Sequence, residues 1–251
     1  MSFRDSIDYR EELISRRLRS VGRALLITGG KGGVGKSLIA SVTALILSKA
    51  NATGLLDLDL HGPSCSMILG VYEPPVEGDD GLVPPVVEGL KVMGLDLLVK
   101  NRPVPLAGSA KEEAIKEILA LTDFGPLEYL VVDSPPGSGD ELLTVIRYFR
   151  EKGYAVVVTT PSPLAVRYAY RMIKLLQSTS FPILGVVENL STDNAEPATA
   201  KLCSETGVRL LGRVPYDHEV ISAGNGERDK LMATGFAKSI ESILHNLGLL
   251  S

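Results

Sequence analysis

Short runs of apolar and β-branched residues recur along the chain, and they predict strands that are buried on both faces of a sheet. These runs cover residues 24–28, 54–58, 129–133, 155–160 and 183–187. Longer stretches, in which apolar residues recur at spacings of three and four, predict helices between most of the strands. The helical stretches cover residues 36–49, 111–121, 141–151, 164–177 and 229–247. Strands that alternate with helices in this way indicate an α/β fold, with a mainly parallel sheet and helices on both faces.

Two segments do not follow this alternation. Residues 1–22 form a charged stretch that predicts an N-terminal surface helix, and we expect a single domain over residues 23–251. Residues 73–105, between the second and third predicted strands, are rich in proline, glycine and acidic residues, which indicates an excursion from the sheet. Within that segment, LVPPVVEGLKVMGL is typical of a hairpin that turns near Glu88 and Gly89.

The composition limits what such a domain can do. The 251 residues are 45% hydrophobic and carry a net charge of -4, so the chain can bury one large core and offers no overall basic footprint for nucleic acid. No apolar run approaches membrane-spanning length, and the N-terminus lacks an apolar signal core. The two cysteines, Cys65 and Cys203, are too few for a disulfide framework. We therefore expect a cytoplasmic protein whose partners include neither nucleic acid nor membrane.

A glycine-rich stretch, GGKGGVGKS at residues 29–37, lies between the first predicted strand and the first predicted helix. It carries the phosphate-loop (P-loop) pattern in its required context, with Gly30, Gly35, Lys36 and Ser37 at the diagnostic spacing. The N–H groups of the loop and the N-terminus of the helix then face one anionic site. Lys36 is expected to neutralise the β- and γ-phosphates of a nucleotide, and the Ser37 hydroxyl to bind Mg²⁺. The other residues expected to bind the nucleotide here are Lys31, Gly32, Gly33, Val34 and Leu38.

Carboxylates follow two of the predicted strands, and folds of this kind bind ligands where their strands end. Asp133, in YLVVDSPPG, is placed to hold Mg²⁺ through water. Asp57 and Asp59, in LLDLDLHGPS, point the same way in an extended chain. Asp59, at the exit from the strand, is the better candidate to orient or activate the attacking water. Asp57 either shares in catalysis or is a carboxylate that caps a loop or supports the magnesium shell.

Several motifs resemble those of a known ATPase family. KGGVGKS, with its early lysine Lys31, resembles the deviant P-loop of the MinD/ParA-like ATPases. DLDLHGPS, VVDSPPGSGDELLT, GVVENLS and LLGRVPYD together resemble the Mrp/ApbC branch, whose members are ATP-dependent iron–sulfur cluster carriers. The resemblance covers residues 23–226 and implies the MinD/ParA-like P-loop NTPase fold. It also implies slow hydrolysis of ATP with Mg²⁺, and an iron–sulfur scaffold or an apo-client protein as a partner.

The same resemblance implies a homodimer and assigns further residues. The early lysine of that family reaches the nucleotide of the other subunit, so Lys31 would serve the partner's ATP while Lys36 serves its own. A cation supplied in this way stabilises the charge that develops on the phosphates only once the dimer has closed. A second phosphate contact within the same subunit is the alternative for Lys31. By the resemblance, Asn189 would contact the adenine edge and Pro215 would line the base pocket.

The chain departs from the family where the cluster is expected. Mrp-like proteins carry a Cys-x-x-Cys shortly after the stretch that matches residues 189–191, whereas this chain has STDNAEPATAKLCSETG with Cys203 alone. Two copies of Cys203 supply two of the four thiolates that a 4Fe–4S cluster needs. We predict that any cluster is labile and substoichiometric, bound chiefly through Cys203 at the dimer interface or through ligands borrowed from a partner, with Cys65 as the remaining thiolate. A small buried apolar side chain is the alternative for both cysteines. The family's Trp-Arg-Gly element is also replaced, by LAG at residues 106–108.

A positioning or scaffolding ATPase of the MinD/ParA type, without a cluster, is the alternative function. Membrane docking in that group uses a basic amphipathic C-terminal helix. Here the C-terminal GFAKSIESILHNLGLLS has an apolar stripe with Lys238 as its only lysine or arginine, so packing on the core explains the stripe better.

Overall fold

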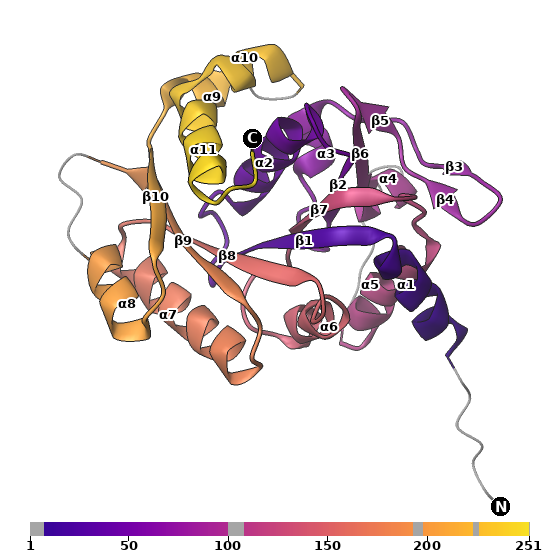
Figure 1. The fold of residues 1–251 in the computed structure, drawn as a ribbon, viewed down its shortest axis with the longest axis horizontal. Helices are drawn as coiled ribbons and strands as arrows, with labels where there is room; N and C mark the ends of the chain where they lie inside the picture. The colour runs from indigo at the N-terminus through magenta and orange to yellow at the C-terminus, as the bar shows by residue number, and fades with distance from the viewer. Residues whose placement is uncertain (1–7, 100–107, 193–197, 223–225, 251) are drawn as a thin grey trace, which may run out of the picture.

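The computed structural model describes residues 8–99, 108–192, 198–222 and 226–250. Its centre is an eight-stranded sheet (Figure 1). Neighbouring strands are parallel, except for the last pair at one edge, which is antiparallel. The strand order is β10 (Leu210–Pro215), β9 (Ile183–Ser191), β8 (Gly153–Thr159), β1 (Val21–Thr28), β7 (Leu127–Asp133), β2 (Thr53–Asp57), β6 (Leu90–Gly94) and β5 (Val86–Val87).

Helices cover both faces of the sheet (Figure 1). Side chains of β1 alternate between two cores, with Leu25 and Ile27 in one core and Ala24 and Leu26 in the other. The first core is closed mainly by α2 (Lys36–Ser48), α3 (Cys65–Leu69), α10 (Arg228–Ala233) and α11 (Gly235–Asn246). The second is closed mainly by α1 (Tyr9–Arg19), α5 (Ala110–Leu121), α6 (Asp140–Tyr148), α7 (Pro163–Ser178) and α8 (Ala198–Thr206). The predicted α/β class is therefore confirmed. Two further helices, α4 (Leu95–Val99) and α9 (His218–Ser222), are short.

The stretch 229–247, predicted as one helix, is two helices that meet at Thr234. The backbone of Thr234 is extended (φ -66°, ψ 158°), and its side chain accepts a hydrogen bond from the N–H of Ala237. A threonine in this role caps the start of a new helix, which separates α10 from α11. The apolar stripe of α11 is buried on the core, through Phe236, Ile240, Ile243 and Leu244. Over the described residues, no helix has the length and hydropathy needed to cross a membrane.

The segment expected to leave the sheet contributes two of its strands. A separate two-stranded ribbon, β3 (Val76–Glu77) with β4 (Leu82–Val83), does leave it. β6, however, pairs in parallel with β2, so the expectation of an excursion is wrong for this stretch. β5 and β6 form a hairpin, and its turn residues Glu88 and Gly89 both have positive φ (49° and 80°). β6 is a short apolar run that is buried in the sheet. Because prolines and glycines flank it, the sequence around it resembles a loop.

The N-terminal helix α1 is held against the sheet at the amino-terminal ends of the strands. Ile14 is 1% exposed and packs in the second core. Lys152 Nζ donates to the carbonyls of Leu18, Arg19 and Val21 at 3.1, 2.9 and 2.6 Å, which caps the end of the helix. β1 begins at Val21, within the expected N-terminal segment. The domain boundary between residues 22 and 23 stays a prediction.

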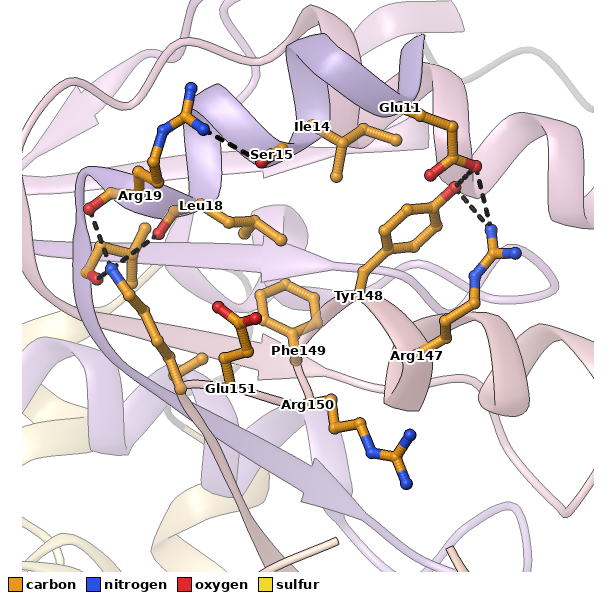
Figure 2. Close-up of a pocket in the computed structure, with 13 residues that line it drawn as sticks. Glu11, Ile14, Ser15, Leu18, Arg19, Arg147, Tyr148, Phe149, Arg150 and Glu151 are labelled. Atoms are coloured by element: carbon orange, nitrogen blue, oxygen red, sulfur yellow. Dashed lines mark hydrogen bonds and ion pairs between the residues drawn. The ribbon is translucent and has the colours of Figure 1, made fainter. Parts of the chain in front are cut away.

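A hollow of about 390 Å³ lies between α1 and the end of α6 (Figure 2). The Tyr148 hydroxyl donates to Glu11 at 2.7 Å, and Arg147 donates to the same carboxylate at 3.2 Å. Glu11, Arg147 and Tyr148 therefore pair with one another at this hollow, and Lys152 pairs with the backbone. The hollow is at the opposite edge of the sheet from the glycine-rich loop, and its interactions join α1 to the rest of the domain.

Candidate nucleotide-binding site

The glycine-rich loop connects the end of β1 to the start of α2, in the middle of the sheet. Gly33 and Gly35 both have positive φ (78° and 89°), a conformation that side chains with a Cβ rarely adopt. Space also requires glycine, because a Cβ on Gly35 would lie 2.2 Å from Asn189 Nδ2. A Cβ on Gly30 would lie 2.4 Å from the carbonyl oxygen of Tyr168. The loop can therefore bring its backbone N–H groups close to a ligand at the N-terminus of α2, where Leu38 lies in the first turn.

The two lysines of the loop lie in different environments. Lys36 is 6% exposed, and its Nζ is 3.8 Å from Asp59 Oδ2. This ion pair places Asp59 at the mouth of the loop, where the terminal phosphate of a nucleotide is expected. Lys31 is exposed, and the ion pairs formed by the described residues do not include it. The structure thus brings Lys36 and Asp59 together and leaves Lys31 facing outward.

Ser37 and Asp133, predicted to hold Mg²⁺, are in direct contact. The Ser37 hydroxyl donates to Asp133 Oδ2. Asp133 is fully buried, and its Oδ1 has no hydrogen-bond partner within the described chain. Burial raises the pKa of Asp133 to about 6, although the nearby charge of Lys36 and the bond from Ser37 oppose this. A hydroxyl and a carboxylate with a free buried oxygen suit Mg²⁺ and its bound waters, so these residues fit the ion.

Asp57 holds the loop that follows β2. Its Oδ1 accepts a hydrogen bond from the N–H of Asp59 at 3.0 Å, and its Oδ2 accepts from Ser64 and Cys65 at 2.8 and 3.0 Å. Asp57 is 2% exposed, and burial together with the charge of Asp133 raises its pKa to about 7. These contacts support the interpretation of Asp57 as a carboxylate that caps a loop, rather than one that acts on water directly.

The residues expected to contact the base lie at the same edge of the sheet, at the ends of β9 and β10. Asn189 is 1% exposed, and its Nδ2 donates to the carbonyl of Val34 at 2.9 Å. Its Oδ1 has no hydrogen-bond partner among the residues described. Pro215 is exposed and is paired in register with Ser191. Both positions are compatible with a base-binding role, which stays a prediction.

One buried carboxylate was not anticipated from the sequence. Glu188 is fully buried, and its Oε1 accepts hydrogen bonds from Ser191 Oγ at 2.8 Å and from Arg213 Nε at 3.1 Å. A glutamate directly after the apolar run at residues 183–187 was the available signal, because a buried ionisable residue needs a partner. Glu188 links β9 to β10 and so supports the strand ends that carry Asn189 and Pro215.

The two cysteines lie on opposite faces of the sheet. Cys65, at the start of α3, is fully buried in the first core, with its Sγ 3.7 Å from Asp133 Oδ2. Cys203, on α8, is half-buried and packs against the second core; burial raises its pKa, as does the charge of Glu188. Within one subunit the two thiols therefore do not share a ligand site. Residues 106 and 107 of the altered family element lie outside the described residues.

The comparisons with known proteins agree with this geometry. A profile of the ParA group, described as NUBPL iron-transfer P-loop NTPase, matches residues 20–247. The cytosolic Fe-S cluster assembly factor NUBP1 homolog of Brugia malayi is 35% identical, over 92% of this chain and 82% of that protein. An iron-sulfur cluster carrier protein of Saccharolobus solfataricus is 34% identical, over 84% of this chain and 77% of its own length.

Solved structures show the same fold. A nucleotide-binding protein from Archaeoglobus fulgidus, in complex with ADP, superposes with a TM-score of 0.73 at 27% identity, over 89% of this chain and 93% of the other. The cell division ATPase MinD of Pyrococcus furiosus gives a TM-score of 0.67 at 21% identity, over 92% of this chain and all of the other, which shows a shared fold. A profile match over nearly the whole chain and a P-loop assembled at the centre of a parallel sheet lead to one conclusion: this chain belongs to the NUBPL iron-transfer family of P-loop NTPases.

Proposed function

We propose that this protein is a homodimeric, Mg²⁺-dependent ATPase that carries iron–sulfur clusters to apo-proteins in the cytoplasm. The contact between Ser37 and Asp133 beside the buried Lys36 carries the proposal, because it supplies the phosphate and magnesium groups of an ATPase in one place. The names of the Brugia malayi and Saccharolobus solfataricus relatives support the cargo and, in the first case, the cytosolic location.

The ion pair between Lys36 and Asp59 at the P-loop suggests how hydrolysis would proceed. When ATP occupies the P-loop, the ammonium group of Lys36 binds the phosphates, and Asp59 loses its partner. Asp59 then accepts a hydrogen bond from the attacking water and orients it toward the γ-phosphate. Ser37 and, through water, Asp133 would hold Mg²⁺, which would supply positive charge to the phosphate oxygens. Asp57 keeps the loop of Asp59 in place through its three backbone hydrogen bonds.

The exposed position of Lys31 supports a dimeric mechanism. A cation that faces outward from the P-loop is available to a nucleotide in a second subunit, whereas Lys36 is buried in its own. Closing the dimer would add Lys31 to the partner's site and complete it. Hydrolysis then requires two subunits to associate, so the bound nucleotide controls whether the dimer is closed.

This chain has few thiolates of its own to bind a cluster. Cys203 is half-buried on α8, so two copies at an interface supply two thiolates. Cys65 lies across the sheet from Cys203 and is fully buried, which leaves it unsuited to the same cluster. The cluster is therefore labile and completes its coordination with ligands from a scaffold or client.

Anaerobic reconstitution tests this function directly. Iron and sulfide are assayed in the wild type and in Cys203→Ser, and cluster transfer to an apo-ferredoxin is followed with and without ATP. We expect substoichiometric iron in the wild type, a marked loss in Cys203→Ser, and transfer that changes with ATP. Absence of bound iron under every nucleotide condition would support a positioning ATPase of the MinD/ParA type instead.

A further inference from the structure

Three side chains with metal-ligating atoms converge beside the P-loop, on the side facing the first core. Asp57, Cys65 and Asp133 are each at most 2% exposed. One ligand atom from each lies within 4.8 Å of the other two. They come from the end of β2, the first residue of α3 and the end of β7, so three separate elements hold them in place. The proposed nucleotide chemistry uses the carboxylate of Asp133 and makes no use of the thiol.

The distances suit a metal ion with mixed sulfur and oxygen ligands. Cys65 Sγ is 3.7 Å from Asp133 Oδ2. In a tetrahedral site with a metal–sulfur distance of about 2.3 Å and a metal–oxygen distance of 2.0–2.2 Å, sulfur and oxygen are about 3.5 to 3.7 Å apart. The thiol and the carboxylate therefore already have the spacing of two ligands on one ion. Asp57 is oriented by three backbone N–H groups, as ligand carboxylates commonly are, and its oxygens retain lone pairs.

The charge and hydrogen bonding of the cluster are incomplete without a cation. Asp133 Oδ1 is buried, and it has no hydrogen-bond partner in the part of the chain described. A buried oxygen in that state costs folding free energy unless a ligand or a water meets it. Of the two buried carboxylates, Asp133 has the buried cation Lys36 near it, and Lys36 is also paired with Asp59. A divalent ion bound to Asp133 Oδ2 would supply positive charge beside the two carboxylates, and the unpaired Oδ1 of the same carboxylate is free to bind the ion as well.

We propose that Asp57, Cys65 and Asp133 form a binding site for one thiophilic divalent transition-metal ion of the Fe²⁺, Co²⁺ or Zn²⁺ class, and that this ion competes with Mg-ATP. Thiolate selects these ions over Mg²⁺, which prefers oxygen ligands alone. On binding, the Sγ–H bond of Cys65 is replaced by an Sγ–metal bond, and the proton leaves to solvent. An ion bound at Asp133 Oδ2 would displace the Ser37 hydroxyl from that oxygen, and would so disturb the proposed magnesium shell. The metal site requires no nucleotide; its effect on ATP binding rests on the proposed function.

Cobalt titration of the full-length protein without nucleotide tests the site, because a thiolate bound to Co²⁺ gives a charge-transfer absorption. The two cysteines provide matched variants. We expect one Co²⁺ per chain with this band in the wild type, and the same band in Cys203→Ser, whose single thiol is Cys65. We expect Cys65→Ser to lose the band and to bind Co²⁺ at least about tenfold more weakly. Circular dichroism checks folding, and the result for Cys203→Ser identifies the ligand even where Cys65→Ser fails to fold.

The outcomes separate the site from the ATPase. A missing band in the wild type or in Cys203→Ser, or a band that persists in Cys65→Ser, overturns the metal site. Mg-ATP binding is then measured by calorimetric titration, with Mg-ATP added to excess over the protein, in cobalt-loaded and in metal-free wild type. We expect ATP to bind about tenfold more weakly to the cobalt-loaded protein. Unchanged ATP affinity overturns the competition. If the metal-free protein does not bind Mg-ATP, the proposed function is contradicted. The cobalt band still shows whether Asp57, Cys65 and Asp133 bind a metal ion.

Discussion

The two edges of the parallel sheet use most of their polar residues in different ways, although Arg17 Nε on α1 is also buried without a hydrogen-bond partner among the described residues. At the amino-terminal edge, Lys152 donates to three backbone carbonyls and Tyr148 donates to Glu11. At the carboxyl-terminal edge, Asp133 and Asn189 each keep a buried oxygen that is unpaired among the described residues. Paired groups stabilise the contacts between elements, whereas buried unpaired groups cost folding free energy until a ligand meets them. The amino-terminal edge therefore contributes stability, and the carboxyl-terminal edge is prepared for binding.

Substitution of one lysine at each edge gives the sharpest test of this difference. Lys36→Ala is expected to weaken Mg-ATP binding by about a hundredfold or more, since a hydrogen bond to a charged group contributes up to about 3 kcal/mol. Lys152→Ala is expected to leave ATP affinity unchanged. Isothermal titration calorimetry measures both, with circular dichroism to confirm folding. Equal ATP affinity in Lys36→Ala and wild type would remove the P-loop lysine from the site.

Within the carboxyl-terminal edge, Asp59 and Asp57 are expected to differ. Asp59→Ala should bind ATP almost normally and turn over about a hundredfold or more slowly, which is the scale of losing a positioned base. Asp57→Ala should mainly lower stability, because three backbone N–H groups lose their acceptor. Phosphate-release assays and urea unfolding distinguish the two effects. Normal turnover in Asp59→Ala would move the role in orienting water to Asp57.

The division of labour between Lys31 and Lys36 can be tested in mixed dimers. Lys31→Ala and Lys36→Ala are each expected to lose turnover. In a heterodimer of the two, one site has both an intact Lys36 and a Lys31 from the partner, so equal mixing should restore about a quarter of the wild-type activity if subunits pair at random. An arrangement within one subunit restores none. No recovery, in mixtures shown to contain heterodimers, contradicts the assignment of Lys31 to the partner's site.

At the amino-terminal edge, the expected effects are on stability alone. Lys152→Ala should lower the free energy of unfolding by about 1–3 kcal/mol, because two carbonyls at the end of α1 and one at the start of β1 lose a charged donor. Urea denaturation followed by circular dichroism measures this change. Lys174→Ala, on the exposed surface of α7, is the control and should change stability by less than about 0.5 kcal/mol. Equal stability of Lys152→Ala and wild type would show that α1 is held by its apolar contacts.

The smallest expected effect is a dependence of stability on high pH. The pKa of Tyr148 is raised from 10.0 to about 12, by burial and by its hydrogen bond to Glu11. The folded state therefore retains the phenol proton more strongly than the unfolded state, so its contribution to stability is complete below pH 10 and is lost as the pH rises toward 12. Stability of wild type and Tyr148→Phe, measured across this range, should converge as the pH rises. A constant difference would contradict the raised pKa.

Local sequence alone determined the position of the P-loop and most of the strands and helices. A glycine-rich loop between an apolar run and an amphipathic stretch needs only neighbouring residues to specify strand, loop and helix. For the same reason, Lys36 and Ser37 were identified without any tertiary information. The split at Thr234 and the strand β10 were missed, because a capping residue and a short apolar run compete with stronger local signals around them. The hairpin of β5 and β6 was predicted, but the parallel pairing of β6 with β2 was not, because that pairing depends on tertiary contacts.

Tertiary structure decided which residues meet. Asp133 contacts Ser37 across 96 positions and Cys65 across 68, because parallel strands bring their ends to one edge whatever their separation in the chain. The sequence left Asp57 open between catalysis and capping, and only the fold of α3 against β2 showed which N–H groups reach it. The sequence left both cysteines as candidates for one cluster. In the fold, the helices that carry them cover opposite faces of the sheet, so the cysteines lie in opposite cores. Pairings of this kind depend on strand order and on burial, which no local pattern encodes.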